Sequence, residues 1–258
     1  MKLLLKSVVT GLLLFFGAPG LFGQSAAEIS QKSTEVIDLG STQMDFTIYI
    51  RDNRGSERVR QLTMISGVFN GVGKTLVRFT APSDVQGTTL LIYDNKDKED
   101  DMWIYMPALK KVRRIISSER GKSFMGSEFT NADMSKPNQA DFNYSLLGKA
   151  VYDGKECWMV QSECKDQTIC KAYGYSKSVS YIDKNSYLGY KVEYYDLSGN
   201  LHRILTSHDY KNVTKNTFFS YRTVMENVQN KRVSEMVVNK VETGNKPGEE
   251  IFSPNALQ

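Results

Sequence analysis

The segment Gly73-Lys74-Thr75 is the part of this chain that comes nearest to a nucleotide-binding motif, because Gly-Lys-Thr ends a phosphate-binding loop. Such a loop also needs a glycine where this chain has Val68. Leu76, Val77 and Phe79 then continue as a strand, whereas a phosphate-binding loop opens a helix. A hairpin turn therefore explains these glycines, and no nucleotide site is expected.

The other residues that could do chemistry stand alone. His202 and His208 have no serine or cysteine in an arrangement typical of a catalytic triad, and the sequence holds no Gly-x-Ser-x-Gly turn. Zinc would need paired ligand spacing, which these histidines lack. We therefore expect a protein that is not an enzyme, with no catalytic residue, no cofactor and no metal. A secreted hydrolase using Asp133 and Asp141 is a weaker alternative.

The cysteines are an odd set, so at most one pair can form in an oxidising compartment. We expect a disulfide between Cys164 and Cys170, with the residues between them forming the loop of a closed hairpin. Cys157 lies in an apolar strand pattern and is expected to behave as a small buried hydrophobe.

A local basic cluster says more about partners than the overall charge, which balances 33 Lys and Arg against 29 Asp and Glu. A focused positive patch attracts anionic head groups or acidic proteins, although a solvated strand face explains it equally well. Nucleic acid is not an expected partner, since the cluster lacks regular aromatic residues. Its members are Lys110, Lys111, Arg113, Arg114, Arg120 and Lys122.

The strand pattern before Pro107 is apolar on both faces, because Trp103 and Tyr105 alternate with Met102 and Ile104. Either this strand is packed on both sides, or one of its faces lines a ligand cavity. More apolar bulk follows in the sequence, at Phe124, Met125 and Phe129.

Residues 1–23 have the pattern of a cleaved secretory signal peptide, with Lys2 and Lys6 ahead of an apolar run and small residues after it. No cysteine lies near the expected cleavage site, so we expect no lipidation. Residues 24–258 contain no linker rich in proline, glycine or serine. We therefore expect one domain in an extracytoplasmic compartment.

Period-two alternation dominates the chain after residue 40, as in Met44, Phe46, Ile48 and Ile50. Turn signals between such segments predict roughly ten or eleven antiparallel strands. A sheet of this length curls and must cover its apolar face. The uncovered part would form a concave apolar surface, unless a second sheet packs on it as a sandwich.

Helical patterns are scarce. The clearest runs from Ala26 to Asp38, with Ser25 as its N-cap. A second short helix is expected to begin near Ser127 or Thr130 and to end before Pro137.

The stretch from Phe79 to Met134 carries motifs that are specific in combination. In these motifs the chain resembles the outer-membrane lipoprotein-sorting proteins, the LolA- and LolB-like periplasmic lipoprotein carriers. Position 128 is Glu where the resemblance leads us to expect Asp. The motifs are Pro82 with Gly87-Thr88-Thr89-Leu90-Leu91, Trp103-Ile104-Tyr105-Met106-Pro107-Ala108-Leu109, Lys111-Val112-Arg113-Arg114-Ile115, and Ser123-Phe124-Met125-Gly126-Ser127-Glu128-Phe129.

The resemblance implies a mainly β fold, a strongly curved antiparallel half-barrel with an N-terminal helix and one or two short helices on its concave side. It implies a periplasmic carrier or chaperone that binds acyl chains of lipoproteins or other lipids and moves them toward the outer membrane. The expected partners are those acyl chains, an inner-membrane transporter and an outer-membrane acceptor. The alternative function is a non-catalytic structural or interaction protein of the cell envelope with a packed sandwich core.

The resemblance also implies site residues. Head-group or partner contacts are expected at Lys111, Arg113 and Arg114. The acyl-chain cavity is expected to be lined by Leu91, Ile92, Trp103, Tyr105, Phe124, Met125 and Phe129.

Overall fold

The computed structural model describes residues 24–95, 98–215 and 217–257, so the expected signal peptide lies outside the described residues. The described chain forms a 13-stranded antiparallel sheet in the order β6-β5-β4-β3-β2-β1-β13-β12-β11-β10-β9-β8-β7. The strands are β1 (Thr42–Arg51), β2 (Glu57–Phe69), β3 (Val72–Ala81), β4 (Thr89–Asp94), β5 (Asp101–Met106), β6 (Lys111–Ile115), β7 (Phe142–Tyr152), β8 (Lys155–Cys164), β9 (Lys177–Asp183), β10 (Gly189–Tyr195), β11 (Leu201–Thr214), β12 (Thr217–Asn227) and β13 (Arg232–Thr243).

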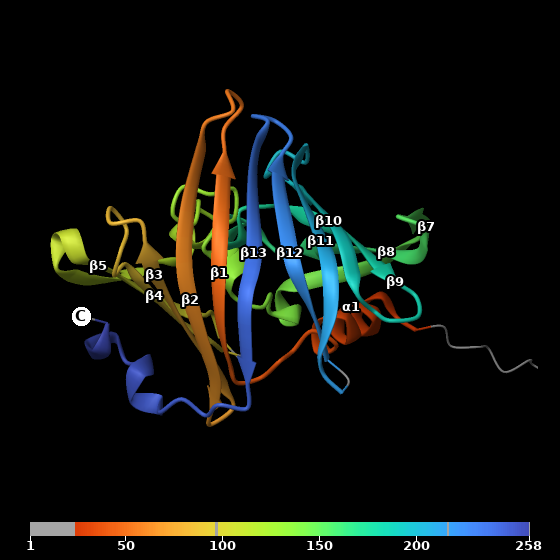
Figure 1. The fold of residues 1–258 in the computed structure, drawn as a ribbon. Coiled ribbons are helices and arrows are strands. Elements are labelled where there is room, and N and C mark those ends of the chain that lie inside the picture. The colour runs from red at the N-terminus through yellow and green to blue at the C-terminus, as the bar shows by residue number, and fades with distance from the viewer. Residues whose placement is uncertain (1–23, 96–97, 216, 258) are drawn as a thin grey trace, which may run out of the picture.

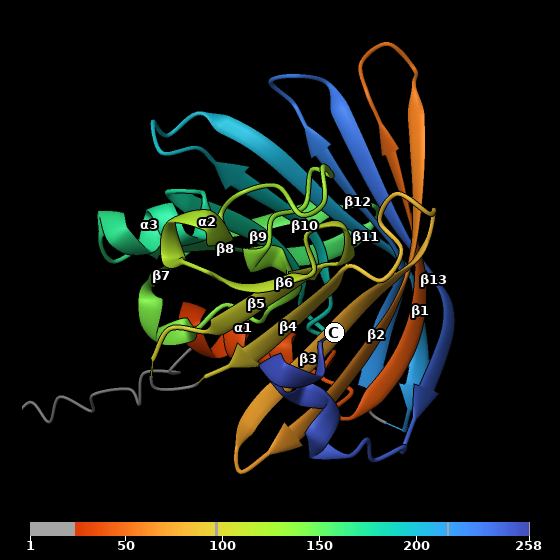
Figure 2. The same ribbon diagram turned by 90° about the vertical axis from the view of Figure 1, so that its left-hand side faces the viewer.

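The chain builds the sheet in two runs, first from its middle to one edge and then from the other edge back to the middle. Strands β1 to β6 form a meander, residues 116–141 then cross to the far end of the sheet, and β7 to β13 return until β13 pairs with β1. Strands β6 and β7 are the two edges, so strand pairing does not close the barrel. Figures 1 and 2 show the sheet curling around the crossing segment, which we define as residues 116–141.

This arrangement confirms the predicted curved antiparallel half-barrel. The sandwich alternative is wrong for the described chain, because its named strands all belong to one sheet. The predicted number of strands was too low. Strands β5 and β6 are joined by a short 3-10 turn, Pro107–Leu109, which ends at Lys110 in the left-handed region (φ 48°).

Period-two alternation places one apolar row on the concave side. In β1, the side chains of Met44, Phe46, Ile48 and Ile50 are all at most 5% exposed and join the main core. Their neighbours in the strand face the other way, where Arg51 pairs with Glu235 of β13. The concave side is therefore the face that must be covered.

Helix α1 (Ala26–Glu35) covers part of this face and confirms the predicted N-terminal helix. Ser25 and Glu28 form a capping box, in which each side chain accepts a hydrogen bond from the other residue's backbone N–H. Ile29 is 1% exposed and packs with Val160 and Ile182 of the sheet. Burial of such a side chain contributes about 2 kcal/mol.

The second predicted helix, beginning near Ser127 or Thr130, is reduced to a 3-10 turn at Ala132–Met134. Thr130 and Asp133 exchange the two hydrogen bonds of a capping box, with the Asp133 carboxylate accepting from the Thr130 N–H at 2.7 Å. The turn nevertheless ends at once, because the backbone of Ser135 is extended (φ −119°, ψ 164°). The other short helices of the described chain are α2 (Ser117–Arg120), in the crossing segment, and α3 (Gln167–Tyr173), between β8 and β9.

The convex side carries a smaller apolar cluster under the C-terminal segment. The 3-10 turns Glu249–Phe252 and Pro254–Ala256 lie outside β3 and β4, as Figure 2 shows. Phe252 and Leu257 are each 1% exposed and pack with Leu91. The C-terminal segment therefore shields apolar groups on the outer face of the sheet.

Helices α2 and α3 pack against each other and bring together chain segments that follow β6 and β8. The contact depends on two glycines. A Cβ atom on Gly121 would lie 2.7 Å from the backbone of Gly174, which itself has φ +79°. Arg120, next to this contact, stacks on Tyr173 with 5.4 Å to the ring centroid.

We expect Gly121→Ala to lower the free energy of unfolding by about 1–3 kcal/mol, because the added methyl group would clash with rigid backbone. Urea denaturation followed by circular dichroism measures this change. Gly189→Ala is the control, since its Cβ would make only ordinary contact with Ser33 at 3.6 Å. Equal stabilities of the two variants would contradict the proposed tight contact.

Candidate functional site

A cavity of about 330 Å³ opens on the concave side of the sheet. Its wall is formed by strands from both halves of the sheet, by the link between α1 and β1, and by residues 133–136 of the crossing segment. This volume lies near the lower end of the range of small-molecule sites. The apolar lining includes Leu39, Met44, Phe46, Met64, Ile92, Met134, Phe219, Met236 and Val238.

The cavity's rim carries charged groups that are mostly paired. Asp38, which follows α1, forms an ion pair with Lys136 of the crossing segment, with 2.7 Å between the lysine nitrogen and a carboxylate oxygen. Both side chains are about half exposed. Asp133 pairs with the buried Arg203 of β11 at 2.7 Å. These contacts hold the crossing segment over the sheet beside the cavity.

Asp94 is the exception among the charged groups of the wall. It is the last residue of β4 and lines the cavity. Its side chain has no hydrogen-bond or ion-pair partner in the described chain. Burial raises the pKa of its carboxyl from 3.8 to about 6, and the negative charge of Asp100 adds to this. Gly73 lies beside it on β3, where a Cβ atom would be 3.7 Å from an Asp94 carboxylate oxygen.

The loop Ser123–Phe129 plugs the concave side next to these walls. Phe124 and Phe129 are 2% and 3% exposed and belong to the main core. The ring of Phe124 lies 5.5 Å from that of Phe79 in β3. Met125 takes φ 51° and Gly126 φ 78°, which turns the loop back so that both phenylalanines point into the core.

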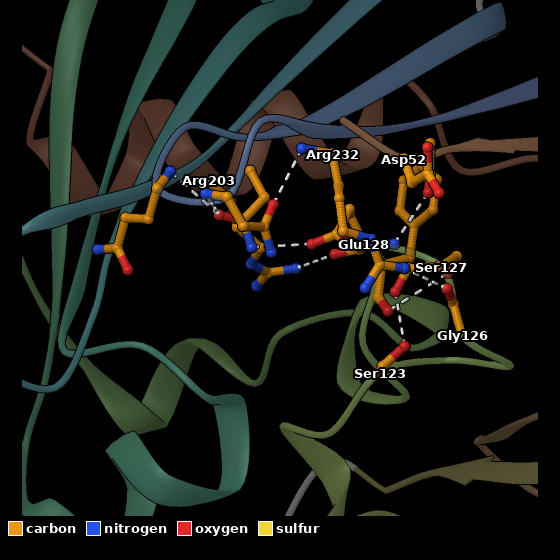
Figure 3. Close-up of polar contacts among 12 residues, drawn as sticks. Asp52, Ser123, Gly126, Ser127, Glu128, Arg203 and Arg232 are labelled. Carbon is orange, nitrogen blue, oxygen red and sulfur yellow. Dashed lines mark hydrogen bonds and ion pairs between the residues drawn. The ribbon is translucent and has the colours of Figure 1, made fainter. Parts of the chain in front are cut away.

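Polar contacts anchor this loop to strands β11 to β13 (Figure 3). The Glu128 carboxylate accepts a hydrogen bond from Asn227 at 2.8 Å and forms an ion pair with Arg232 at 2.9 Å. The Glu128 carbonyl accepts a hydrogen bond from Arg203, and its N–H donates to Ser234. Since Glu128 is only 8% exposed, these partners replace the water that it loses on folding.

The fold resembles those of solved proteins. A domain described as an outer membrane lipoprotein-sorting protein from Vibrio parahaemolyticus superposes with a TM-score of 0.83 and 28% identity, covering 90% of this chain and 97% of its own. A DUF1329 family protein from Desulfovibrio piger gives a TM-score of 0.83 at 23% identity, covering 90% of this chain and 98% of its own. A LolA superfamily protein from Nitrosomonas europaea gives 0.71 at 20% identity, again with 90% and 98% covered.

A family model described only as “Uncharacterized protein” matches residues 71–258. The chain belongs to the family of this model. Its fold is LolA-like, and the resemblance to the outer-membrane lipoprotein-sorting proteins that the sequence predicted is confirmed at the level of the fold. No curated protein sequence matches it.

The LolA-like fold divides the predicted cavity residues between the two faces of the sheet. Ile92 lines the cavity. Leu91, Trp103 and Tyr105 have the opposite parity and pack in the convex cluster with Phe252. Phe124, Met125 and Phe129 lie in or against the main core beside Ile92. The predicted residues therefore do not form one wall, because adjacent residues of a strand point to opposite faces.

The basic residues predicted to contact head groups or partners lie on β6, at the edge of the LolA-like sheet. Lys111 is exposed, Arg113 pairs with Glu119 at 2.7 Å, and Arg114 pairs with Asp101. None of the three lines the cavity. Arg120, counted in the same basic cluster, is buried instead.

Arg120 pairs with Asp100 at 2.7 Å, and each side chain is 4% exposed. Burial raises the pKa of Asp100, against the effect of the Arg120 charge. Ser135 of the crossing segment also donates to the Asp100 carboxylate, at 2.9 Å. Through Arg120 and Ser135, Asp100 therefore joins the β4–β5 connection to both ends of the crossing segment.

The cysteines are free thiols, so the predicted pair of Cys164 with Cys170 is not formed in the structure. The expected hairpin loop between them is wrong, because Asp166 caps helix α3 and places Cys170 on that helix. Burial raises the pKa of Cys164, and the neighbouring Cys170 thiol adds to the effect. Cys157 is 0% exposed within β8, as predicted.

Several cavity residues escaped the sequence analysis because they come from segments far from the motifs. Met44 was visible only as a member of an alternating strand. Phe219 and Met236 lie well outside the motifs, and Asp94 lies close to one of them without belonging to it. In the described chain, no group of three or more His, Cys, Asp or Glu side chains is placed to hold a metal ion. None of the helices described is long and apolar enough to cross a membrane.

We expect Glu128→Gln to lower the free energy of unfolding by about 1–3 kcal/mol, because it removes the charge that pairs with Arg232 inside the loop anchor. Chemical denaturation at pH 7.5 measures the loss. Glu242→Gln is the matched control, since Glu242 pairs with Lys240 on the surface and should change stability by less than about 1 kcal/mol. A loss no larger than the control's would show that the anchor is not stabilising.

We expect Asp94→Asn to raise stability at pH 7.5. The pKa of Asp94 is raised in the folded protein, so the folded state binds the proton more tightly, and stability falls as pH rises from about 4 to 6. Because the carboxyl is partly open to solvent, we expect a gain of about 1 kcal/mol that vanishes below pH 4. Thermal or urea unfolding across this pH range measures it, and a pH-independent difference would contradict it.

Proposed function

We propose that this protein binds acyl chains of lipoproteins or other lipids in the concave cavity and carries them through the periplasm toward the outer membrane. In this proposal residues 24–258 act as one lipid-binding domain after removal of residues 1–23 as a signal peptide. The protein then works as a chaperone without a catalytic step. The observation that carries the proposal is the apolar cavity between the sheet, the α1–β1 link and the crossing segment.

The chemistry of the lining supports this proposal. Methionine side chains are unbranched and polarizable, so Met44, Met64, Met134 and Met236 suit flexible aliphatic ligands. Each methylene group that leaves water is stabilised by about 0.8 kcal/mol. An acyl segment of about eight methylenes therefore gains about 6 kcal/mol before the entropic cost of association. Affinity needs only apolar area here, and no acid–base group.

The cavity also has an entrance that opens at low cost. The Asp38–Lys136 ion pair joins the α1–β1 link to the crossing segment, and both side chains are about half exposed. Such surface pairs contribute about 0–1 kcal/mol. In our proposal, separating this pair lets a chain enter, while the Glu128 anchor keeps the rest of the crossing segment in place.

Cargo transfer needs a partner, and the edge strand β6 is the proposed contact. Lys111, Arg113 and Arg114 lie on this edge, away from the cavity lining, and Arg114 has a side chain 60% exposed. A positive edge of this kind speeds the encounter with acidic surfaces. We propose that it meets an inner-membrane transporter or an outer-membrane acceptor rather than the bound head group.

We expect Met236→Trp to weaken binding of a neutral apolar fluorescent probe, N-phenyl-1-naphthylamine, at least about tenfold, because the larger ring fills the cavity. Val237→Trp is the control, since residue 237 lies next in β13 and faces the convex side. Fluorescence titration measures both affinities. Mass spectrometry of the purified protein should also detect lipids bound to it.

Two outcomes would contradict the proposed function. One is that the natural protein binds no apolar probe and carries no lipid. The other is that Met236→Trp and Val237→Trp, both folded by circular dichroism, bind the probe equally well.

A further inference from the structure

The cavity wall has one charge that the described chain leaves unbalanced. Lys74 pairs with Glu249 and Lys136 with Asp38, at 2.7 Å each. Asp133, the remaining charged residue of the lining apart from Asp94, pairs with Arg203. Asp94 alone has no partner among the described residues. The wall therefore offers a bound ligand one free hydrogen-bond acceptor that carries negative charge.

The surroundings of Asp94 leave space for a ligand group. Its neighbour across the β3–β4 pairing is Gly73, which has no side chain to fill the cavity next to the carboxylate. Ile92, two residues earlier on the same face, and Met134 of the crossing segment line the cavity with apolar atoms. An aliphatic chain lying along these residues would bring its polar end to Asp94.

We propose that the cavity selects amphiphiles whose aliphatic chain ends in a cationic amine, with the Asp94 carboxylate as the group that binds the amine. This proposal rests on the proposed function, namely that the cavity holds aliphatic chains. A charge-assisted hydrogen bond between an amine and a carboxylate is about twice as strong as a neutral one. A ligand carboxylate would instead meet a like charge in an apolar setting.

The selectivity should depend on pH. The pKa of Asp94 is about 6, raised by burial and by the charge of Asp100, while Lys136 and Arg120 act in the opposite direction and Asp38 in the same one. Above this value the carboxyl is ionised and can bind an amine. Below it, the protonated carboxyl loses its charge, and the preference for an amine should fade.

The experiment compares decylamine, decanol and decanoate, which share one chain length, as competitors of N-phenyl-1-naphthylamine. At pH 7.5 we expect decylamine to bind about tenfold more tightly than decanol, and decanoate more weakly than decanol. At pH 5 the advantage of decylamine should shrink. In Asp94→Asn, decylamine and decanol should bind alike at both pH values.

Asp153→Asn is the matched control, because Asp153 is exposed in the β7–β8 turn and does not line the cavity. It should keep the tenfold preference. Equal binding of decylamine and decanol to the natural protein, or a preference that survives in Asp94→Asn, would overturn the proposal. If none of the three compounds competes with the probe, the proposed function itself fails, which separates the two hypotheses.

The amine could belong to a single-chain amphiphile or to the head group of a phospholipid. Vesicles of phosphatidylcholine with and without phosphatidylethanolamine separate these sources. Competition that requires phosphatidylethanolamine and is lost in Asp94→Asn supports a phospholipid head group. Competition by decylamine but by neither vesicle supports a single-chain ligand.

Discussion

A single open sheet with one apolar face imposes the constraint on which the rest of this structure depends. Its 13 strands are not closed by strand pairing, so the concave face has to be covered by segments that are not strands. Helix α1 covers the part near β7 to β9, and the crossing segment covers the centre. The cavity is the area of apolar face that these two covers leave between them.

The covers are held by polar contacts that would be costly to leave unpaired. Arg120 with Asp100 and Glu128 with Arg232 fix the two ends of the loop that carries Phe124 and Phe129 into the core. Removing one partner of a buried pair leaves the other charge buried without a partner. These ion pairs and the hydrophobic packing beside them therefore stabilise the loop together. By contrast, the Asp38–Lys136 pair is half exposed and holds its segment only weakly. The covering segments are therefore held most firmly around the loop anchor and least firmly at the Asp38–Lys136 pair, the proposed entrance of the cavity.

Strand parity explains why a local motif was a poor guide to the cavity. Trp103 and Tyr105 lie in the most distinctive part of the sequence, yet they pack on the convex side under the C-terminal segment. Ile92 and Asp94, which line the cavity, share a strand with Leu91, which does not. A motif conveys which residues lie close together, whereas the register of the strands and the covering segments decide which face each residue serves.

Local patterns in the sequence were sufficient for most of the strands, the capped helix α1 and the buried Cys157, because each depends on neighbours within a few residues. The curved half-barrel came from the family resemblance, and the fold confirms it. Contacts between distant segments stayed beyond reach: the convex C-terminal segment, the burial of Arg120, the helix that carries Cys170, and the isolation of Asp94. Each of these depends on which residues from other strands or from the crossing segment lie alongside, and only the folded chain brings those residues together.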